Sequence, residues 1–176
     1  SRCGFLKPPY TGSLTGHRAV ATQVLARGHT RVGVPAAIGR DHRFTEHAHR
    51  HSVGVAVIAL EVPDANAAYD YATSRGAEGV IPFTVEEDDT GELRYSVIQG
   101  YGETLFKFVD RSGYGGVFAP GFEARNAIDG KVHQGIGLSA IDHIVGNVEL
   151  GAMDKWVKFF EQTMGFSLLQ HFDVED

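Results

Sequence analysis

Residues 53–76 carry the sequence VGVAVIALEVPDANAAYDYATSRG, and this stretch decides the fold. Its first ten residues are rich in β-branched side chains, which favour a strand. Pro63 ends that strand because proline has no backbone N–H to donate to a ladder. Asp64 is a good N-cap, and alanines and Tyr71 follow it at helical spacing until Gly76 offers a C-terminal stop. The stretch therefore predicts a strand followed directly by a helix.

Further strands are predicted on the carboxyl-terminal side of this stretch. Residues 93–101 and 104–109 form two apolar runs, and Gly102-Glu103 between them is typical of a tight turn. The acidic run at residues 86–89, just before Gly91, indicates a solvated hairpin tip without chemistry. The 22 glycines lie between short apolar runs, as in short strands joined by turns. The predicted fold class is α+β.

The same order of elements begins again near the carboxyl terminus. Residues 141–148 predict a strand, and residues 153–164 predict an amphipathic helix that Gly165 ends. Another strand is expected over residues 166–172. The order of strand, helix and strands thus occurs twice, which indicates an internal duplication.

The chain divides into one complete module and two incomplete ones. Two strands are predicted at residues 16–26 and 30–38, without the strand and helix that open a full module. The predicted organisation is an incomplete first βαβββ module, a connector, a complete second module, a linker and the start of a third module, at residues 1–39, 40–52, 53–122, 123–140 and 141–176.

Composition excludes several classes of function. Sixteen Lys and Arg against 22 Asp and Glu give a net charge of −6, so no basic field is available for nucleic acid or anionic lipid. The single cysteine, Cys3, excludes an intrachain disulfide and a Cys-based zinc cluster, and it is typical of a reducing compartment. No apolar run reaches the roughly 18 residues of a membrane span. We therefore expect a cytoplasmic protein with neither nucleic-acid nor membrane partners.

A cluster of imidazoles and carboxylates lies in the connector. Such side chains are good ligands for Zn, Fe, Ni or Cu. His47 and His51 are four residues apart and would share one face of a helix. No strand-borne third ligand accompanies them, so a solvated connector is favoured and a role for the cluster stays open. Its members are Asp41, His42, Glu46, His47, His49 and His51.

His143 differs from the cluster because it lies within a predicted strand. Alternation along the strand puts Ile141, His143 and Val145 on one face. An inward imidazole among apolar neighbours needs a partner. Spacing alone favours a structural role for His143, with a hydrogen-bonded ring, over a role as a metal ligand. A strand would nevertheless hold a metal ligand rigidly in place. No phosphate-binding loop or nucleophile elbow is present in the sequence.

Several motifs carry a resemblance to a known family. Residues 141–151, with 156–160 and 164–166, resemble the start of the catalytic domain of 4-hydroxyphenylpyruvate dioxygenases. Residues 60–65, 109–114 and 120–122 resemble the amino-terminal domain and linker of the same family. The family belongs to the vicinal oxygen chelate group, whose tandem βαβββ modules form an open barrel around a metal. The resemblance implies an amino-terminal domain at residues 1–122 and a catalytic domain that starts at residue 141.

The resemblance also implies a chemistry. Family members hold Fe(II) with two histidines and one glutamate, and His143 matches the first of those histidines, so the motif favours a metal ligand at this position. Val145 matches a residue that lines the substrate pocket. The implied reaction uses O₂ to decarboxylate 4-hydroxyphenylpyruvate oxidatively and to hydroxylate its ring, which gives homogentisate in tyrosine breakdown. Members of the family often form dimers or tetramers, so a homo-oligomer is expected.

Two alternatives stay open. Hydroxymandelate synthases share the fold, the iron ligands and the substrate, but they hydroxylate the benzylic carbon. A non-catalytic small-molecule-binding protein of the same fold is an alternative of another class. The second histidine and the glutamate are expected beyond Asp176. Because one imidazole cannot hold catalytic iron, the 176 residues alone are expected to be inactive.

Overall fold

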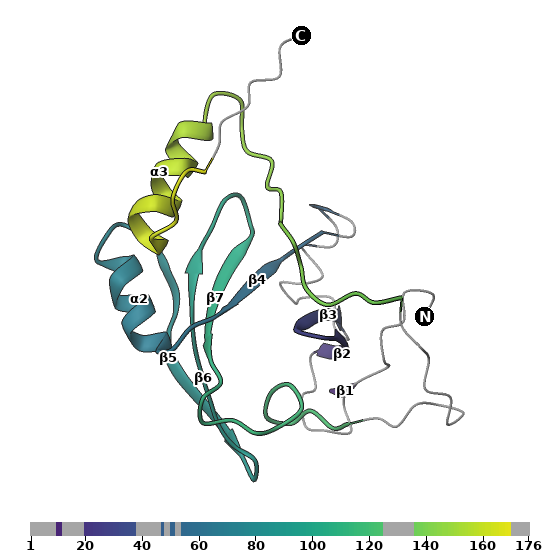
Figure 1. The fold of residues 1–176 in the computed structure, drawn as a ribbon. Helices are drawn as coiled ribbons and strands as arrows, with labels where there is room; N and C mark the ends of the chain where they lie inside the picture. The colour runs from purple at the N-terminus through teal and green to yellow at the C-terminus, as the bar shows by residue number, and fades with distance from the viewer. Residues whose placement is uncertain are drawn as a thin grey trace. The chain divides into compact units, whose positions relative to one another are not determined.

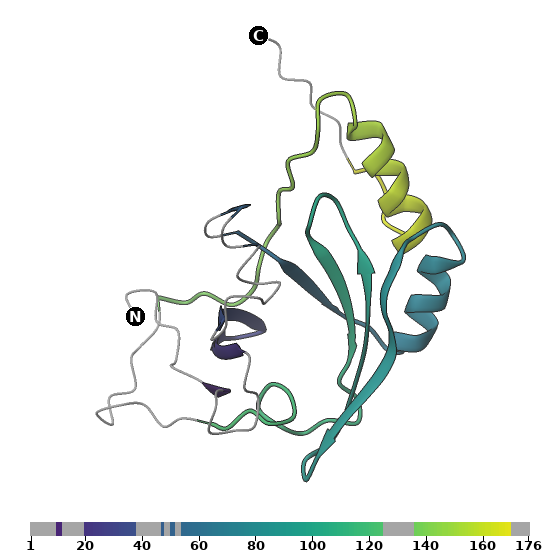
Figure 2. The ribbon, with the colours of Figure 1, turned by 180° about the vertical axis from the view of Figure 1, so that it is seen from behind.

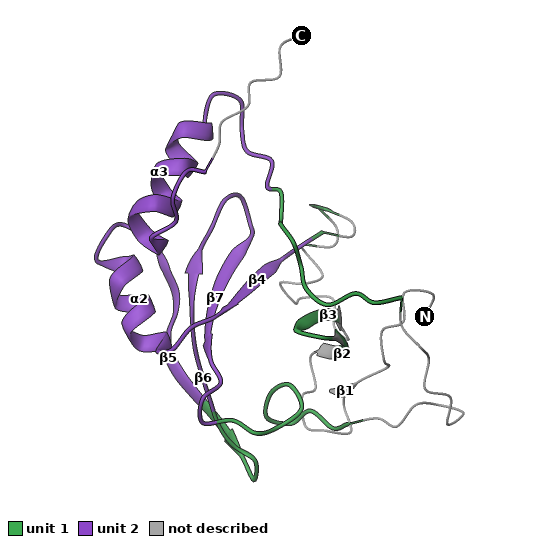
Figure 3. Cartoon of the chain, viewed as in Figure 1, with its two compact units in different colours: residues 1–54, 86–92, 114–145 green, residues 55–85, 93–113, 146–176 purple. Residues whose placement is uncertain are grey.

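The computed structural model of the 176-residue chain forms two compact units, which Figure 3 colours separately. Unit 1 comprises residues 1–54, 86–92 and 114–145, and unit 2 comprises residues 55–85, 93–113 and 146–176. The residues that the structure describes are 10–11, 20–37, 47, 50–51, 54–124 and 136–169.

A βαβββ module forms most of unit 2, and the end of its β5–β6 hairpin belongs to unit 1. The sheet has the order β4-β7-β6-β5 (Figure 1). The first strand, β4, runs parallel to the last strand, β7, and β7 is antiparallel to β6. The strand predicted before Pro63, the helix after Asp64 and the two strands predicted between residues 93 and 109 are therefore present. Its elements are β4 (Val57–Glu61), α2 (Ala65–Thr73), β5 (Gly79–Asp88), β6 (Gly91–Gln99) and β7 (Leu105–Asp110).

Helix α2 begins and ends where the local signals place it. The Oδ1 atom of Asp64 accepts hydrogen bonds from the backbone N–H groups of Asn66 at 2.8 Å and Ala67 at 2.9 Å. These two bonds satisfy donors that a helix start leaves without an internal partner. Gly76 follows the helix with a φ of +100°, a conformation that glycine adopts without strain. Both predicted boundary signals are thus confirmed.

The core of unit 2 lies between one face of this sheet and two helices. Helix α3 (Met153–Met164) lies beside α2, as the two opposite views show (Figures 1 and 2). Phe159, Phe160 and Met164 of α3 pack against the buried cluster. The buried Ser96 hydroxyl donates to the carbonyl of Ala65 at 2.8 Å and ties β6 to the start of α2. The buried members of the cluster are Ile58, Ala65, Ala72, Ala77, Ile98, Phe106 and Phe108.

A small antiparallel sheet belongs to unit 1. It has the order β1-β2-β3, from β1 (Tyr10–Thr11), β2 (Val20–Arg27) and β3 (Thr30–Ala37). The two predicted strands of the incomplete first module are therefore confirmed over the residues that are described. Gly28 in the turn has a φ of +54°, and a Cβ there would lie 2.6 Å from the carbonyl oxygen of Ser139. The backbone N–H of His29 donates to that same oxygen at 3.0 Å.

The acidic run ends one strand and begins a turn. The carboxylate of Asp88, the last residue of β5, accepts hydrogen bonds from the backbone N–H of Thr90 at 2.8 Å and from the hydroxyl of Tyr114 at 3.1 Å. Donation from the Thr90 side chain and backbone holds the pKa of Asp88 below its usual value. The predicted hairpin tip is confirmed, and one of its carboxylates fastens the turn.

Two sequence-based predictions of strands need correction, and one strand was not predicted. Residues 141–148 form no strand, and the described part of the predicted strand at residues 166–172, residues 166–169, forms none either. A strand requires a hydrogen-bonded neighbour, and no described strand pairs with either segment. Conversely, β5 was not predicted, because it contains Pro82 and ends in acidic residues, and both features argue against a strand. An edge strand such as β5 tolerates both.

The described ranges contain no helix that is both long and apolar enough to span a bilayer.

Candidate functional site

His143 lies on an exposed segment and is paired with its neighbour in sequence. Its Nδ1 atom lies 2.7 Å from Oδ2 of Asp142. The side chains of His143 and Asp142 are 74% and 96% exposed. The prediction that the His143 side chain points inward from a strand is therefore wrong. The segment pairs with no described strand, so it has no inner and outer face.

The contact with Asp142 determines which ring nitrogen of His143 can bind a metal. An ionised carboxylate only accepts hydrogen bonds, so Nδ1 of His143 must donate to it. In the neutral imidazole the lone pair then resides on Nε2. Metal-binding histidines commonly donate their other ring N–H to a carboxylate in this way, which fixes the tautomer and the ring orientation. The donor chemistry of this residue fits a metal ligand.

The segment around His143 exposes apolar side chains. Val145 is 78% exposed, and Ile141 and Ile144 are 54% and 50% exposed. Such a concentration of exposed apolar residues is typical of a surface that binds something. Within the described ranges, His143 belongs to no group of three metal-binding side chains.

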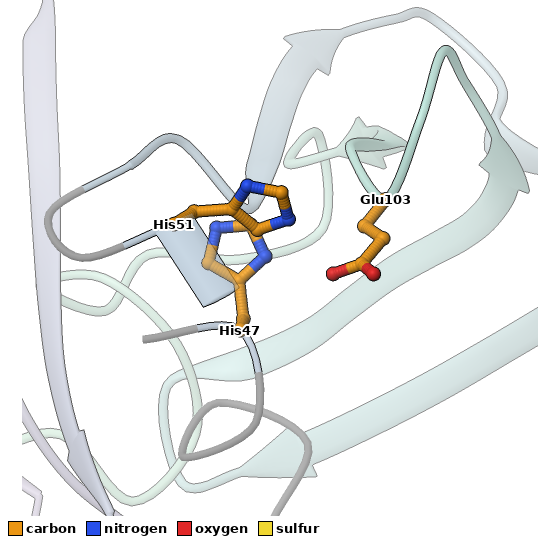
Figure 4. Close-up of side chains that lie close together, drawn as sticks. All are labelled: His47, His51 and Glu103. Carbon is orange, nitrogen blue, oxygen red and sulfur yellow. The ribbon is translucent and has the colours of Figure 1, made fainter. Parts of the chain in front are cut away.

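His47 and His51 of the connector lie against one another (Figure 4). Both residues are helical, and their ring centroids are 4.7 Å apart at an interplanar angle of 45°. The predicted common helix face is confirmed. Two imidazoles one turn apart can bind one transition-metal ion side by side, although a closed site needs further ligands. Asp41, His42, Glu46 and His49 lie outside the described residues. Glu103, also drawn in Figure 4, belongs to unit 2.

Sequence reasoning missed a close contact between Gly146 and Tyr101 in unit 2. A Cβ on Gly146 would lie 2.5 Å from Cζ and 2.6 Å from Oη of Tyr101. The Tyr101 ring in turn has edge contacts with Trp156 and Phe160 of α3, at centroid distances of 5.9 and 6.2 Å. The one available signal was a glycine inside a strand-like pattern, which often marks a close approach of the backbone.

Glu149 lies at the start of the turn that leads into α3. Its own backbone N–H holds the pKa of the exposed Glu149 carboxyl below its usual value. The carboxylate also lies 3.7 Å from Nζ of Lys155. Because both side chains are largely exposed, this pair supports the local turn and is not a candidate catalytic group.

The amino-acid sequence is similar to a family of known function. The family model described as hydroxyphenylpyruvate dioxygenase, HPPD, N-terminal, matches residues 12–122. A 4-hydroxyphenylpyruvate dioxygenase from Aspergillus fumigatus is 33% identical over 94% of this chain and 45% of its own length. The enzyme of that name from Dictyostelium discoideum is 34% identical over 94% of this chain and 46% of its own length. The chain thus spans about half the length of the curated relatives it matches.

Two solved structures share the fold. A mutant of 4-hydroxymandelate synthase from Streptomyces coelicolor has a TM-score of 0.77 at 20% identity and covers 93% of this chain and 46% of its own. A fusion of a xylose isomerase-like TIM barrel with a 4-hydroxyphenylpyruvate dioxygenase has a TM-score of 0.71 at 20% identity, over 94% of this chain and 24% of its own. These likenesses concern the fold, and they confirm the predicted α+β fold of the vicinal oxygen chelate type.

Proposed function

Since the chain belongs to the 4-hydroxyphenylpyruvate dioxygenase family, we propose that the whole protein is an Fe(II)- and O₂-dependent dioxygenase. It decarboxylates 4-hydroxyphenylpyruvate oxidatively and hydroxylates the ring to give homogentisate, a step of tyrosine breakdown. One observation carries this proposal: the histidine in the family-like motif, His143, has its Nδ1 bonded to a carboxylate and its Nε2 left for a metal.

The proposed domain division assigns residues 1–122 to an amino-terminal domain, 123–140 to a linker and 141–176 to the start of the catalytic domain. The family model that matches residues 12–122 is itself described as N-terminal, which supports the first of these assignments. His143 then lies three residues into the catalytic domain.

The site residues have distinct roles in this proposal. His143 binds the iron through Nε2, and Asp142 holds the imidazole in the tautomer that leaves this nitrogen free. Val145 contributes an apolar wall for the aromatic ring of the substrate. The bound Fe(II) would supply the O₂ chemistry and the chelation of the 2-oxo acid, while the protein orients the substrate and excludes water. A second histidine and a glutamate from sequence after Asp176 complete the ligand set.

The proposal extends to partners and location. The partners are 4-hydroxyphenylpyruvate, O₂ and further copies of the same chain in a dimer or tetramer. The proposed location is the cytoplasm, and the low cysteine content, Cys3 alone, supports it.

Product analysis on the full-length protein tests this function. Wild-type protein with Fe(II) is expected to consume O₂ with 4-hydroxyphenylpyruvate and to yield homogentisate by mass spectrometry and NMR. 4-Hydroxymandelate as the product would establish the synthase alternative instead. Binding of the substrate without any iron requirement or O₂ uptake would establish a non-catalytic binding protein.

The His143→Ala variant tests the assigned ligand. We expect its Fe(II) affinity to fall by more than the roughly 10- to 100-fold that loss of an outer partner costs, because the substitution removes a direct ligand. The matched control is His29→Ala, which removes another exposed imidazole in unit 1. Equal Fe(II) affinity in the two variants would refute the assignment of His143.

A further inference from the structure

The contact between Gly146 and Tyr101 is too close for any side chain at position 146. A Cβ there would lie 2.5 Å from Cζ, 2.6 Å from Oη and 3.0 Å from Cε1 of the Tyr101 ring. Gly146 is not among the glycines with a positive φ. Space, and not backbone conformation, therefore requires glycine at this position.

The Tyr101 ring cannot move aside at low cost. Edge contacts hold it at centroid distances of 6.0 Å from Phe106, 5.9 Å from Trp156 and 6.2 Å from Phe160. Its backbone lies in the β6–β7 turn, where the N–H of Thr104 donates to the Tyr101 carbonyl at 3.1 Å. Aromatic neighbours and the turn thus hold the ring as a rigid surface for the backbone of Gly146.

This surface lies next to the proposed metal ligand in sequence. Gly146 follows His143 by three residues and Val145 by one. A backbone fixed at Gly146 restricts where the preceding residues can lie, because three residues span at most about 10 Å of extended chain. Tyr101, by contrast, lies 45 residues before Gly146 in the sequence, in the turn between β6 and β7.

We propose that Tyr101 is a positioning residue for the metal site: its ring seats the backbone of Gly146 and, through the three-residue connection to His143, restricts where that histidine can lie. This inference rests on the proposed function. Tyr101 acts through Gly146 and not on the substrate or the metal.

A double-mutant cycle on the full-length protein tests the proposal. Gly146→Ala is expected to weaken Fe(II) binding about 10- to 100-fold, as loss of an outer support typically does, and to change the visible spectrum of the Co(II)-loaded protein. In the Tyr101→Ala background the same glycine substitution is expected to have much less effect, because removal of the ring makes room for the new methyl group. Gly33→Ala is the control, because a Cβ there would meet nothing closer than 3.9 Å.

Each outcome of this cycle has one meaning. A Gly146→Ala effect of equal size with and without the Tyr101 ring would overturn the proposal, as would a fall in Tm with unchanged Fe(II) affinity and Co(II) spectrum. If Gly146→Ala does not fold, Tyr101→Ala alone decides: weaker Fe(II) binding and faster hydrogen exchange at residues 143–147 support the proposal, and wild-type affinity overturns it. If wild-type protein binds Fe(II) and His143→Ala does not, a negative result in the double-mutant cycle refutes the role of Tyr101 and leaves the proposed function standing. If wild-type protein binds no Fe(II), both this inference and the proposed function are wrong.

Discussion

Asp142 matters at the scale of single residues because its carboxylate determines the tautomer of His143. An Asn at this position presents both a carbonyl oxygen and an NH₂ group, and the NH₂ group can donate to Nδ1 and move the imidazole proton to Nε2. We expect Asp142→Asn in the full-length protein to weaken Fe(II) binding about 10- to 100-fold. Isothermal titration under anaerobic conditions measures this effect.

Asp154→Asn is the matched control for Asp142→Asn. Asp154 is also exposed, but it lies in the first turn of α3 and has no contact with His143 in the described part of the chain. Wild-type Fe(II) affinity in Asp142→Asn would show that the carboxylate does not orient the His143 imidazole for metal binding.

Asp110 makes the stability of the protein depend on pH. The side chain is 7% exposed. The Ser112 hydroxyl and backbone N–H, and the guanidinium of Arg94 3.7 Å away, hold the pKa of the Asp110 carboxyl below its usual value. A carboxyl with a lowered pKa in the folded state stabilises the fold at pH values above its pKa in the unfolded chain, about 3.9. This stabilisation is lost as the pH falls from there towards the lower pKa of the folded state. We therefore expect acid to lower the urea denaturation midpoint of Asp110→Asn less than that of wild type when the pH falls below about 4.

The exposed Asp89 provides the comparison for Asp110. Asp89→Asn is expected to retain the wild-type loss of stability in acid. If Asp110→Asn and wild type lose stability in parallel between pH 5 and pH 3, Asp110 does not contribute to this dependence.

At the scale of elements, α2 depends on its cap. Asp64→Ala removes the acceptor of two backbone hydrogen bonds and is expected to lower the free energy of unfolding by about 1 kcal/mol. Asp64→Ser is expected to recover most of that loss, because a Ser hydroxyl also caps well. Urea denaturation followed by circular dichroism measures both, and an Asp64→Ala midpoint equal to that of wild type would contradict the capping role.

The helices were easier to predict than the strands. Residues 153–164 were predicted as a helix with Gly165 at its end, and α3 has these bounds, with Gly165 at a φ of +70°. Periodicity and caps act within a few residues, so the sequence displays them. By contrast, β5 was missed, and the predicted strand at residues 141–148 is wrong, because pairing with a neighbour and not local composition defines a strand.

At the scale of the whole molecule, Phe106 joins the module of unit 2 to α3. Phe106 is 4% exposed, and its ring centroid lies 5.5 Å from that of Phe160. Phe106→Ala leaves a cavity between sheet and helix and is expected to cost about 3–5 kcal/mol of unfolding free energy. Faster hydrogen exchange is expected in both β7 and α3, since they share this core.

The control for Phe106→Ala is Phe83→Ala, on the edge strand β5, where the side chain is 39% exposed. It is expected to change stability far less. If Phe106→Ala accelerates exchange in β7 but leaves α3 protected, the helix is stable without this core.

The sequence by itself determined that a strand is followed directly by a helix after Pro63, the bounds of α2 and α3, the cap at Asp64 and the family-like motif around His143. These features depend on residues a few positions apart. Only the tertiary structure decided that β4 pairs with β7, that α2 and α3 cover one face of a sheet, that His143 is exposed beside Asp142 and that Gly146 touches Tyr101. Most of these facts depend on partners distant along the chain, and the exposure of His143 depends on the lack of a strand partner among the described residues. A local pattern does not identify such partners; the glycine at position 146 signals a close approach but not the ring that it approaches.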